Sequence, residues 1–293
     1  MNNNNYIEFK KERDLGAIIS DTFKFLRLEW KPFFGAILKT AFLPIIIAIG
    51  ALFFYMYSFP SIFGSLDTSD FGVYEEPNFG LLFISIAFMM VFFLIAYVIM
   101  NITALYYVKS YIENNGSVDF MMIQDRVKDK FWSFTGLFFL VALIVLASAL
   151  LCFFPAIYTG TVLALAAPIL VYNNLDATES ISYSFNFIKG HWWETFGVML
   201  VVGIIVNIIG YVFSVPAIIY FFIKAGTVIT TNDPTAFAES LTDPIYLMLN
   251  GISYIGQFIL YGVTLVSSVF IYFDIDEQKN GRGAMDKIDS LGS

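Results

Sequence analysis

Residues 81–108 read LLFISIAFMMVFFLIAYVIMNITALYYV, a long run without a single charged side chain. About 20 consecutive apolar residues are enough for an α-helix to cross the hydrocarbon core of a bilayer. This run therefore predicts a transmembrane helix. Five further stretches meet or nearly meet this length and are mostly apolar, at 34–57, 134–154, 156–172, 195–215 and 245–273.

The composition of the whole chain supports a membrane protein. Of its 293 residues, 58% are apolar and 14% are charged, whereas globular domains are about 45–50% apolar and about 25% charged. A water-soluble domain cannot hide that much apolar surface. We predict an all-α, polytopic membrane helical bundle with six transmembrane helices. A single integral membrane domain covers 1–293, and residues 274–293 form a polar cytoplasmic tail.

The basic residues are distributed unevenly among the predicted loops. Fourteen of the 16 lie before the first span, between spans two and three, between four and five, or after the sixth. The opposite loops, 58–80 and 225–243, contain no Lys or Arg. Because cytoplasmic loops carry the positive excess, we predict that both termini are cytoplasmic. The opening segment, MNNNNYIEFKKERD (1–14), contains no apolar region of a signal peptide. These features favour a multi-pass protein of the bacterial cytoplasmic (inner) membrane.

An internal repeat is visible when the chain is aligned with itself. In one alignment, Ile19-Ser20 lies over Ile181-Ser182, and Trp30 lies over Trp192. A second alignment, in which Trp132 lies over Trp193, gives a third copy. We predict three parallel repeats of an amphipathic helix plus a two-helix hairpin, at about 15–108, 118–172 and 177–273. The amphipathic helices either set the entry angle of the following span or dock lipids or partners. Interfacial anchors are expected at Trp30, Trp132, Trp192 and Trp193.

Several boundaries follow from prolines. Pro155 marks a break between the third and fourth spans, and Pro216 lies near the end of the fifth. The apolar stretch 217–223 is too short to span by itself, so it is either an extension of the fifth helix or an interfacial segment. Glycines in spans four to six predict close helix packing.

Polar residues inside the predicted spans are candidates for function, since lipid makes them costly. They serve either as hydrogen bonds between helices or as the lining of a polar pathway. No Asp, Glu or Arg lies in the middle of a span, which disfavours ion-coupled transport. The candidate polar intramembrane positions are Asn101, Thr103, Asn207, Asn250 and Gln257.

Enzyme chemistry has little support in the sequence. The chain has one cysteine, Cys152, and one histidine, His191, whereas zinc sites need three or four such ligands. A formal net charge of −8 argues against nucleic-acid binding. We interpret His191 as a structural residue of the membrane interface. We expect no catalytic residues, no cofactor-binding or metal-binding residues, and no cofactor.

Three segments carry a family resemblance: KFWSFTGLFFL (130–140), CFFPAIYTG (152–160) and SISYSFNFIKGHWWETFG (180–197). The chain resembles a bacterial family of six-span membrane proteins that is related to the membrane domain of glycerophosphoryl diester phosphodiesterases. Members of that family have no established function, and some carry a beta-carotene oxygenase label. The resemblance covers nearly the whole chain and implies the six-span fold. Its motifs are structural and carry over no catalytic residue, and the chain lacks the histidines that such an oxygenase needs for iron.

Two functions remain open at this point. The first is a non-enzymatic multi-pass inner-membrane protein, which acts as a scaffold or accessory subunit of a membrane assembly. The alternative is a transporter or permeation pathway for a lipid or small solute. A polar cavity lined by Asn101, Asn207 and Gln257 would favour transport, and a dry, close-packed bundle would favour the scaffold. The expected partners are membrane lipids and other inner-membrane proteins.

The predicted orientation can be tested by cysteine labelling in intact cells. A cysteine within residues 67–76 should react with an impermeant reagent added from outside. A cysteine at Ser117 or Asn280 should react only after the membrane is opened, because the positive excess places both on the cytoplasmic side. The reverse labelling pattern would contradict the orientation.

Overall fold

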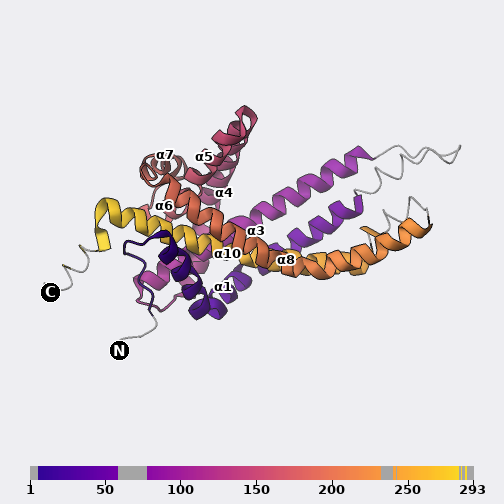
Figure 1. The fold of residues 1–293 in the computed structure, drawn as a ribbon, viewed down its shortest axis with the longest axis horizontal. Helices are drawn as coiled ribbons and strands as arrows, with labels where there is room; N and C mark the ends of the chain where they lie inside the picture. Colours follow the sequence, from indigo (N-terminus) through magenta and orange to yellow (C-terminus); the bar gives the residue numbers. More distant parts are fainter. Residues whose placement is uncertain are drawn as a thin grey trace. The chain divides into compact units, whose positions relative to one another are not determined.

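The computed structural model describes residues 6–58, 78–231 and 243–283, together with residues 240, 241, 285 and 288. Every regular element in these residues is an α-helix (Figure 1). Residues 67–76, and residues 232–239 and 242 of the loop at 225–243, lie outside the described residues. The helices are α1 (Leu15–Ser58), α3 (Phe79–Glu113), α4 (Phe120–Leu151), α5 (Phe153–Leu163), α6 (Ala166–Asn173), α7 (Ala177–Phe187), α8 (Trp192–Thr231) and α10 (Pro244–Asn280).

Six helical stretches of the described residues are long and apolar enough to cross a membrane. They are α1, α3, α4, the α5–α6 pair, the Trp192–Lys224 part of α8, and α10. The predicted all-α bundle with six such helices is therefore confirmed, and the chain is a multi-pass membrane protein. The three repeats and the orientation of the termini stay predictions.

The helices are longer than the apolar runs that predicted them. α1 has 44 residues, which at 1.5 Å per residue span about 66 Å, roughly twice the thickness of a hydrocarbon core. The first predicted amphipathic segment and the first span are thus one continuous helix, and the second pair is likewise joined in α4. In the third pair, α7 and α8 are separate helices.

Backbone conformation explains this difference. Gly190, between α7 and α8, has a φ of +89°, in the left-handed region that glycine adopts without a steric cost. The alignment of Trp30 with Trp192 places Leu28 at the equivalent position of α1, so the helix continues there. Asn115 and Gly116 also have positive φ angles, of 49° and 98°, and they separate α3 from α4.

Three predicted boundaries need correction. The third span ends at Leu151, because Cys152 is extended, with a φ of −173° and a ψ of 158°. Pro155 lies in the first turn of α5, where a missing N–H costs no helical hydrogen bond. The fourth span consists of two helices, α5 and α6. Pro216 lies inside α8, so 217–223 extends the fifth helix; prolines are tolerated in transmembrane helices.

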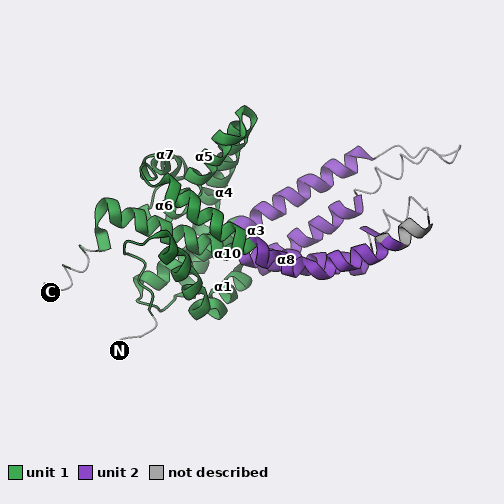
Figure 2. Cartoon of the chain, viewed as in Figure 1, with its two compact units in different colours: residues 1–40, 98–206, 261–293 green, residues 41–97, 207–260 purple. Residues whose placement is uncertain are grey.

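Contacts between Cα atoms divide the chain into two compact units (Figure 2). Unit 1 comprises residues 1–40, 98–206 and 261–293, and unit 2 comprises residues 41–97 and 207–260. The helices α1, α3, α8 and α10 contribute residues to both units. The single domain over 1–293 stays a prediction.

The core of unit 1 is formed by the second halves of α3 and α10 and by α6. Residues 101–108 of α3 and 265–276 of α10 are all buried, and α6 is buried from Ala166 to Val171. Burial on every side is typical of a helix at the centre of a bundle. These two helix ends therefore form the centre of unit 1.

An ordered segment precedes α1 and packs into this core. Ile7 and Phe9 are buried, and the Phe9 ring stacks on the Phe270 ring with centroids 4.2 Å apart. The backbone N–H of Ile7 donates a hydrogen bond to the Tyr111 hydroxyl at 3.1 Å. We call residues 6–14 the N-terminal strap. From the sequence this segment is identified only as polar and charged, without the apolar region of a signal peptide.

Unit 2 is built from four helix segments that pack closely. A Cβ atom added to Gly256 of α10 would lie 2.7 Å from the Phe213 ring of α8, and one added to Gly251 would lie 3.0 Å from the Phe53 ring of α1. These two glycines confirm the expected role of small residues. Gly203 and Gly160 have no such neighbour within 4 Å. Many apolar side chains of unit 2 are exposed, for example Leu43, Phe83 and Phe222, as expected for surfaces that face lipid.

Asp243 ties the start of α10 to α8 within unit 2. Its carboxylate lies 3.0 Å from the Lys224 ammonium and accepts a hydrogen bond from the Tyr220 hydroxyl at 2.9 Å. The backbone N–H groups of Ile245 and Tyr246 also donate to it. The hydrogen bond from Lys224, followed by those from Tyr220 and the backbone, lowers the pKa of Asp243 to about 2.

This ion pair predicts an acid-sensitive component of stability. Because the pKa is lower in the folded chain, the carboxylate stabilises the fold fully above its ordinary pKa of 3.8. That contribution is lost as the pH falls from about 4 to about 2. In detergent, the unfolding midpoint of the wild type should exceed that of Asp243→Asn at pH 6, and the difference should vanish near pH 2.

Asp125→Asn changes an exposed aspartate of α4 and serves as the matched control. A wild-type advantage over Asp243→Asn that stays constant down to pH 2 would contradict the role of this carboxylate.

Candidate functional site

Two of the predicted intramembrane polar residues form hydrogen bonds between helices. The Thr103 hydroxyl of α3 lies 2.8 Å from the Thr40 hydroxyl of α1. The Gln257 side chain of α10 donates to the Ser214 hydroxyl of α8 at 3.0 Å. Ser253 adds a bond from α10 to the Phe213 carbonyl of α8, at 2.7 Å. These contacts fit the interpretation of such residues as interhelical hydrogen bonds.

The remaining three predicted positions differ in burial. Asn250 donates to the Tyr246 carbonyl on its own helix, at 3.0 Å. Asn101 is buried in unit 1, whereas Asn207 belongs to unit 2 and is exposed. Neither of the two cavities described below is lined by Asn101, Asn207 or Gln257. The polar cavity that would have favoured transport, lined by Asn101, Asn207 and Gln257, is therefore neither of these two cavities.

The four tryptophans have large exposed or stacked rings. Trp30, Trp132 and Trp193 are 55%, 78% and 77% exposed, so they are accessible to a membrane interface. Trp192 stacks on Phe196 with ring centroids 5.2 Å apart, and its role as an anchor, like theirs, stays a prediction.

The single histidine has one acidic neighbour. The Nδ1 atom of His191 lies 3.4 Å from the Glu194 carboxylate one turn into α8. Within the described residues, no group of three or more His, Cys, Asp or Glu side chains is placed to hold a metal ion.

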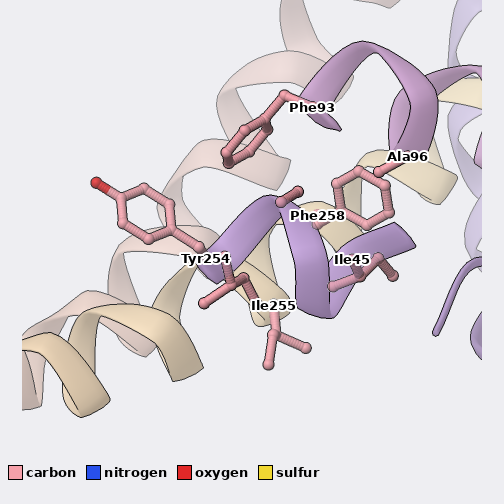
Figure 3. A pocket seen from close by; sticks show the side chains of 8 residues that line it. Ile45, Phe93, Ala96, Tyr254, Ile255 and Phe258 are labelled. Carbon is pink, nitrogen blue, oxygen red and sulfur yellow. The ribbon is translucent and has the colours of Figure 1, made fainter. Parts of the chain in front are cut away.

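Unit 2 contains a small apolar cavity between α1, α3 and α10. Its volume is about 10 Å³, and it is lined by carbon atoms of Ile45, Ala48, Ile49, Phe93, Ala96, Tyr254, Ile255 and Phe258. Among the side chains labelled in Figure 3, only Tyr254 carries an oxygen, and that hydroxyl points away from Ile45 and Ala96. A buried water needs two to four polar partners. We infer that this cavity is dry.

Unit 1 contains a much larger cavity with polar walls. Its volume is about 430 Å³, within the range of about 300–1,000 Å³ that is usual for small-molecule sites. The strap, the ends of α3, α6 and α10, and the residues just after α6 and α10 surround it. Its lining consists of Lys10, Lys109, Ile112, Glu113, Tyr172, Asn174, Tyr272, Phe273, Asp276 and Arg282. We call this the strap cavity, and it is the candidate functional site.

Local structure places the α6 side of the strap cavity. α6 is capped by Asn174, which adopts the left-handed conformation with a φ of 52°, as asparagine does more readily than most residues. Asp176 then begins α7 with a reciprocal capping box with Glu179. Hydrogen bonds from the Glu179 N–H and the Thr178 hydroxyl lower the pKa of Asp176. This tight turn holds Tyr172 on the cavity wall.

Some polar groups on the walls of the strap cavity are bonded within the protein, and one buried hydroxyl has no partner. Lys109 donates to the Val171 carbonyl at 3.0 Å, and the Tyr272 hydroxyl donates to the Asn173 side chain. Asp276 lies 3.6 Å from the Arg282 guanidinium. The Tyr172 hydroxyl, in contrast, is buried and has no hydrogen-bond partner. Buried polar groups are nearly always satisfied, so this hydroxyl needs a partner from outside the chain.

Arg13 holds the strap in place. Its side chain is fully buried, and its Nε donates to Asp21 of α1 at 2.9 Å. Its guanidinium also donates to the carbonyls of Phe9, Lys11 and Glu8, and its backbone N–H donates to Asp274 of α10 at 2.7 Å. Burial lowers the pKa of Arg13.

The sequence did not identify the residues that line the strap cavity as a candidate site, because they come from different segments of the chain. One signal was available: Asp274 and Asp276 follow the apolar run that ends at Phe273, and acidic residues next to such a run are rarely left unpaired. Both are buried. The sixth span was expected to end at 273, so both were assigned to the solvated tail instead.

Comparisons with family models, with curated proteins and with solved structures found no match to this chain.

Arg13 supplies a direct test of how the strap is held. Arg13→Met keeps much of the side-chain volume but removes the guanidinium donors to Asp21 and to the carbonyls of the strap. Asp21 keeps its contact with Lys11, but hydrogen bonds from a charged group contribute about 1.5–3 kcal/mol each. The unfolding midpoint should fall sharply, and limited proteolysis should cut within residues 6–14.

Arg27→Met removes an exposed arginine from the first half of α1 and should change neither readout. Equal behaviour of the two variants would contradict the role assigned to Arg13.

Proposed function

We propose that this chain is a non-enzymatic, multi-pass protein of the bacterial inner membrane that serves as a scaffold or accessory subunit of a membrane assembly. The observation that carries the proposal is the apolar character of the cavity described in unit 2. That cavity has a volume of about 10 Å³. Two polar side chains of α10, the buried Ser253 and the exposed Gln257, bond this helix to α8.

Further support comes from the surface of the amphipathic segments. Met121 and Trp132, on the N-terminal part of α4, are 76% and 78% exposed. Large aromatic and methionine side chains are enriched at protein interfaces and at membrane interfaces. A scaffold needs such surfaces, whereas a catalyst needs an arrangement of acid, base or metal ligands.

The alternative function is a transporter or permeation pathway for a lipid or small solute. One observation favours it, namely the strap cavity, whose volume is about 430 Å³ and whose walls are polar. Transport also requires a polar route through the membrane, and the candidate positions Asn101, Asn207 and Gln257 do not line that cavity. We therefore place the scaffold first. Membership of the six-span family that the sequence resembles is part of the proposal.

Purification from the native membrane tests the scaffold directly. A tagged chain, expressed at its natural level and extracted in a mild detergent, should copurify with another membrane protein in a constant ratio. An unrelated six-span protein with the same tag controls for common contaminants. Recovery of the chain as a monomer with no partner beyond those of the control would contradict the scaffold.

A further inference from the structure

The strap cavity is a candidate ligand site whose chemistry can be read from its walls. Three cationic side chains from three separate segments line it: Lys10 from the strap, Lys109 from α3 and Arg282 from the residues after α10. Two carboxylates, Glu113 and Asp276, also line it. The question is which of these charges are already neutralised within the protein.

Asp276 is engaged within the protein. Its Oδ1 atom accepts a hydrogen bond from the Asn280 side chain at 2.7 Å and lies 3.6 Å from the Arg282 Nε. The carboxylate thereby positions Arg282 at the cavity, and the two charges partly offset each other. The Arg282 side chain is 51% exposed, so its guanidinium can still reach a ligand. Glu113 is exposed at the end of α3, where water screens part of its charge. The rest of that charge acts on Lys109 and offsets part of the positive charge of the wall.

Lys109 and Tyr172, in contrast, have hydrogen-bond donors without a partner in the protein. The Lys109 ammonium has three N–H donors, and the structure gives it a single hydrogen bond, to the Val171 carbonyl at 3.0 Å. The buried Tyr172 hydroxyl has no partner at all. The Tyr272 hydroxyl, on α10, already donates a hydrogen bond to Asn173. Unused donors therefore remain on two residues of the wall, Lys109 and Tyr172.

An excess of donors next to an ammonium group selects a ligand that is anionic and rich in acceptor oxygens. A carboxylate offers two oxygens and a phosphate offers three or more, so a phosphate suits donors that converge from several segments. Ile112 and Phe273 add apolar surface to the same cavity, which can cover carbon atoms attached to that group.

We propose that the strap cavity binds a phosphate-bearing group, with Lys109 and the Tyr172 hydroxyl as its inner contacts and with Arg282, positioned by Asp276, at its entrance. The group can be part of a soluble phosphorylated compound or the headgroup of an anionic phospholipid, because both present the same chemistry. The proposal is independent of the scaffold function, since a ligand site and a docking surface can exist separately.

The test uses the full chain in phosphatidylcholine nanodiscs and measures the midpoint of thermal unfolding. In one arm, inorganic phosphate is titrated against chloride at the same ionic strength. In the other arm, phosphatidylglycerol replaces a fraction of the lipid. A ligand that binds only the folded chain raises the midpoint. A rise in the first arm identifies a soluble phosphate as sufficient, and a rise in the second arm alone identifies the lipid headgroup.

Variants connect the response to the site. Lys109→Met should weaken the apparent affinity by about tenfold or more, which corresponds to the loss of one charge-assisted contact. Tyr172→Phe should also weaken it, and this variant removes no bond within the protein, because the hydroxyl has no partner there. Lys128→Met, which changes an exposed lysine of α4, is the matched control and should respond as the wild type does.

Two results would overturn the proposal. One is the absence of a rise in the midpoint in both arms. The other is a rise that Lys109→Met and Lys128→Met reduce equally while Tyr172→Phe leaves it unchanged, since the anion would then act through surface charge. Neither result bears on whether the chain copurifies with a partner, so failure of this proposal is distinguishable from failure of the scaffold.

Discussion

The arrangement of unit 1 depends on the burial of one cation, Arg13. A guanidinium without water is tolerated only when its donors are satisfied and a carboxylate lies close by. Asp21 and the carbonyls of the strap meet these conditions, and Asp274 accepts the backbone N–H of the same residue. One residue thus ties the strap to both α1 and α10. Lys10, three positions earlier, then lies on the wall of the strap cavity.

The polar side chains of the two units have different kinds of partner. In unit 2 the polar side chains of Ser253 and Gln257 bond to the neighbouring helix, as is needed where lipid offers no partner. Unit 1 holds buried charges and a cavity with polar walls, which requires either water or a ligand. The chemistry that can recognise a molecule is therefore concentrated in unit 1, whereas unit 2 provides close-packed helices with apolar exteriors.

Much of this fold can be predicted from the sequence, because membrane spans are recognised from run length alone. The breaks at Asn115-Gly116 and at Gly190 are also readable, since these residues favour a positive φ. Prolines were more misleading. Pro155 begins a helix and Pro216 lies within one, because the cost of a missing N–H depends on its place in the helix.

The candidate site was not predicted, and the reason is physical. Lys109, Tyr172, Asp276 and Arg282 are brought together only by tertiary packing, and no spacing in the sequence relates them. The intramembrane positions were identified correctly as polar residues inside apolar helices. For Thr103 and Gln257 the structure gives interhelical hydrogen bonds, in agreement with one of the two interpretations left open for them.

Accessibility of introduced cysteines tests this division most directly. Cys152 is exposed, so the background chain carries Cys152→Ser. One variant adds Ile112→Cys in the strap cavity, and the other adds Ala48→Cys in the apolar cavity of unit 2. We predict that Ile112→Cys reacts with water-soluble thiosulfonates, and faster with the anionic than with the cationic reagent, while Ala48→Cys reacts with neither. Equal reaction of both variants, or a preference of Ile112→Cys for the cationic reagent, would contradict the division into a dry cavity in unit 2 and an anion-attracting cavity in unit 1.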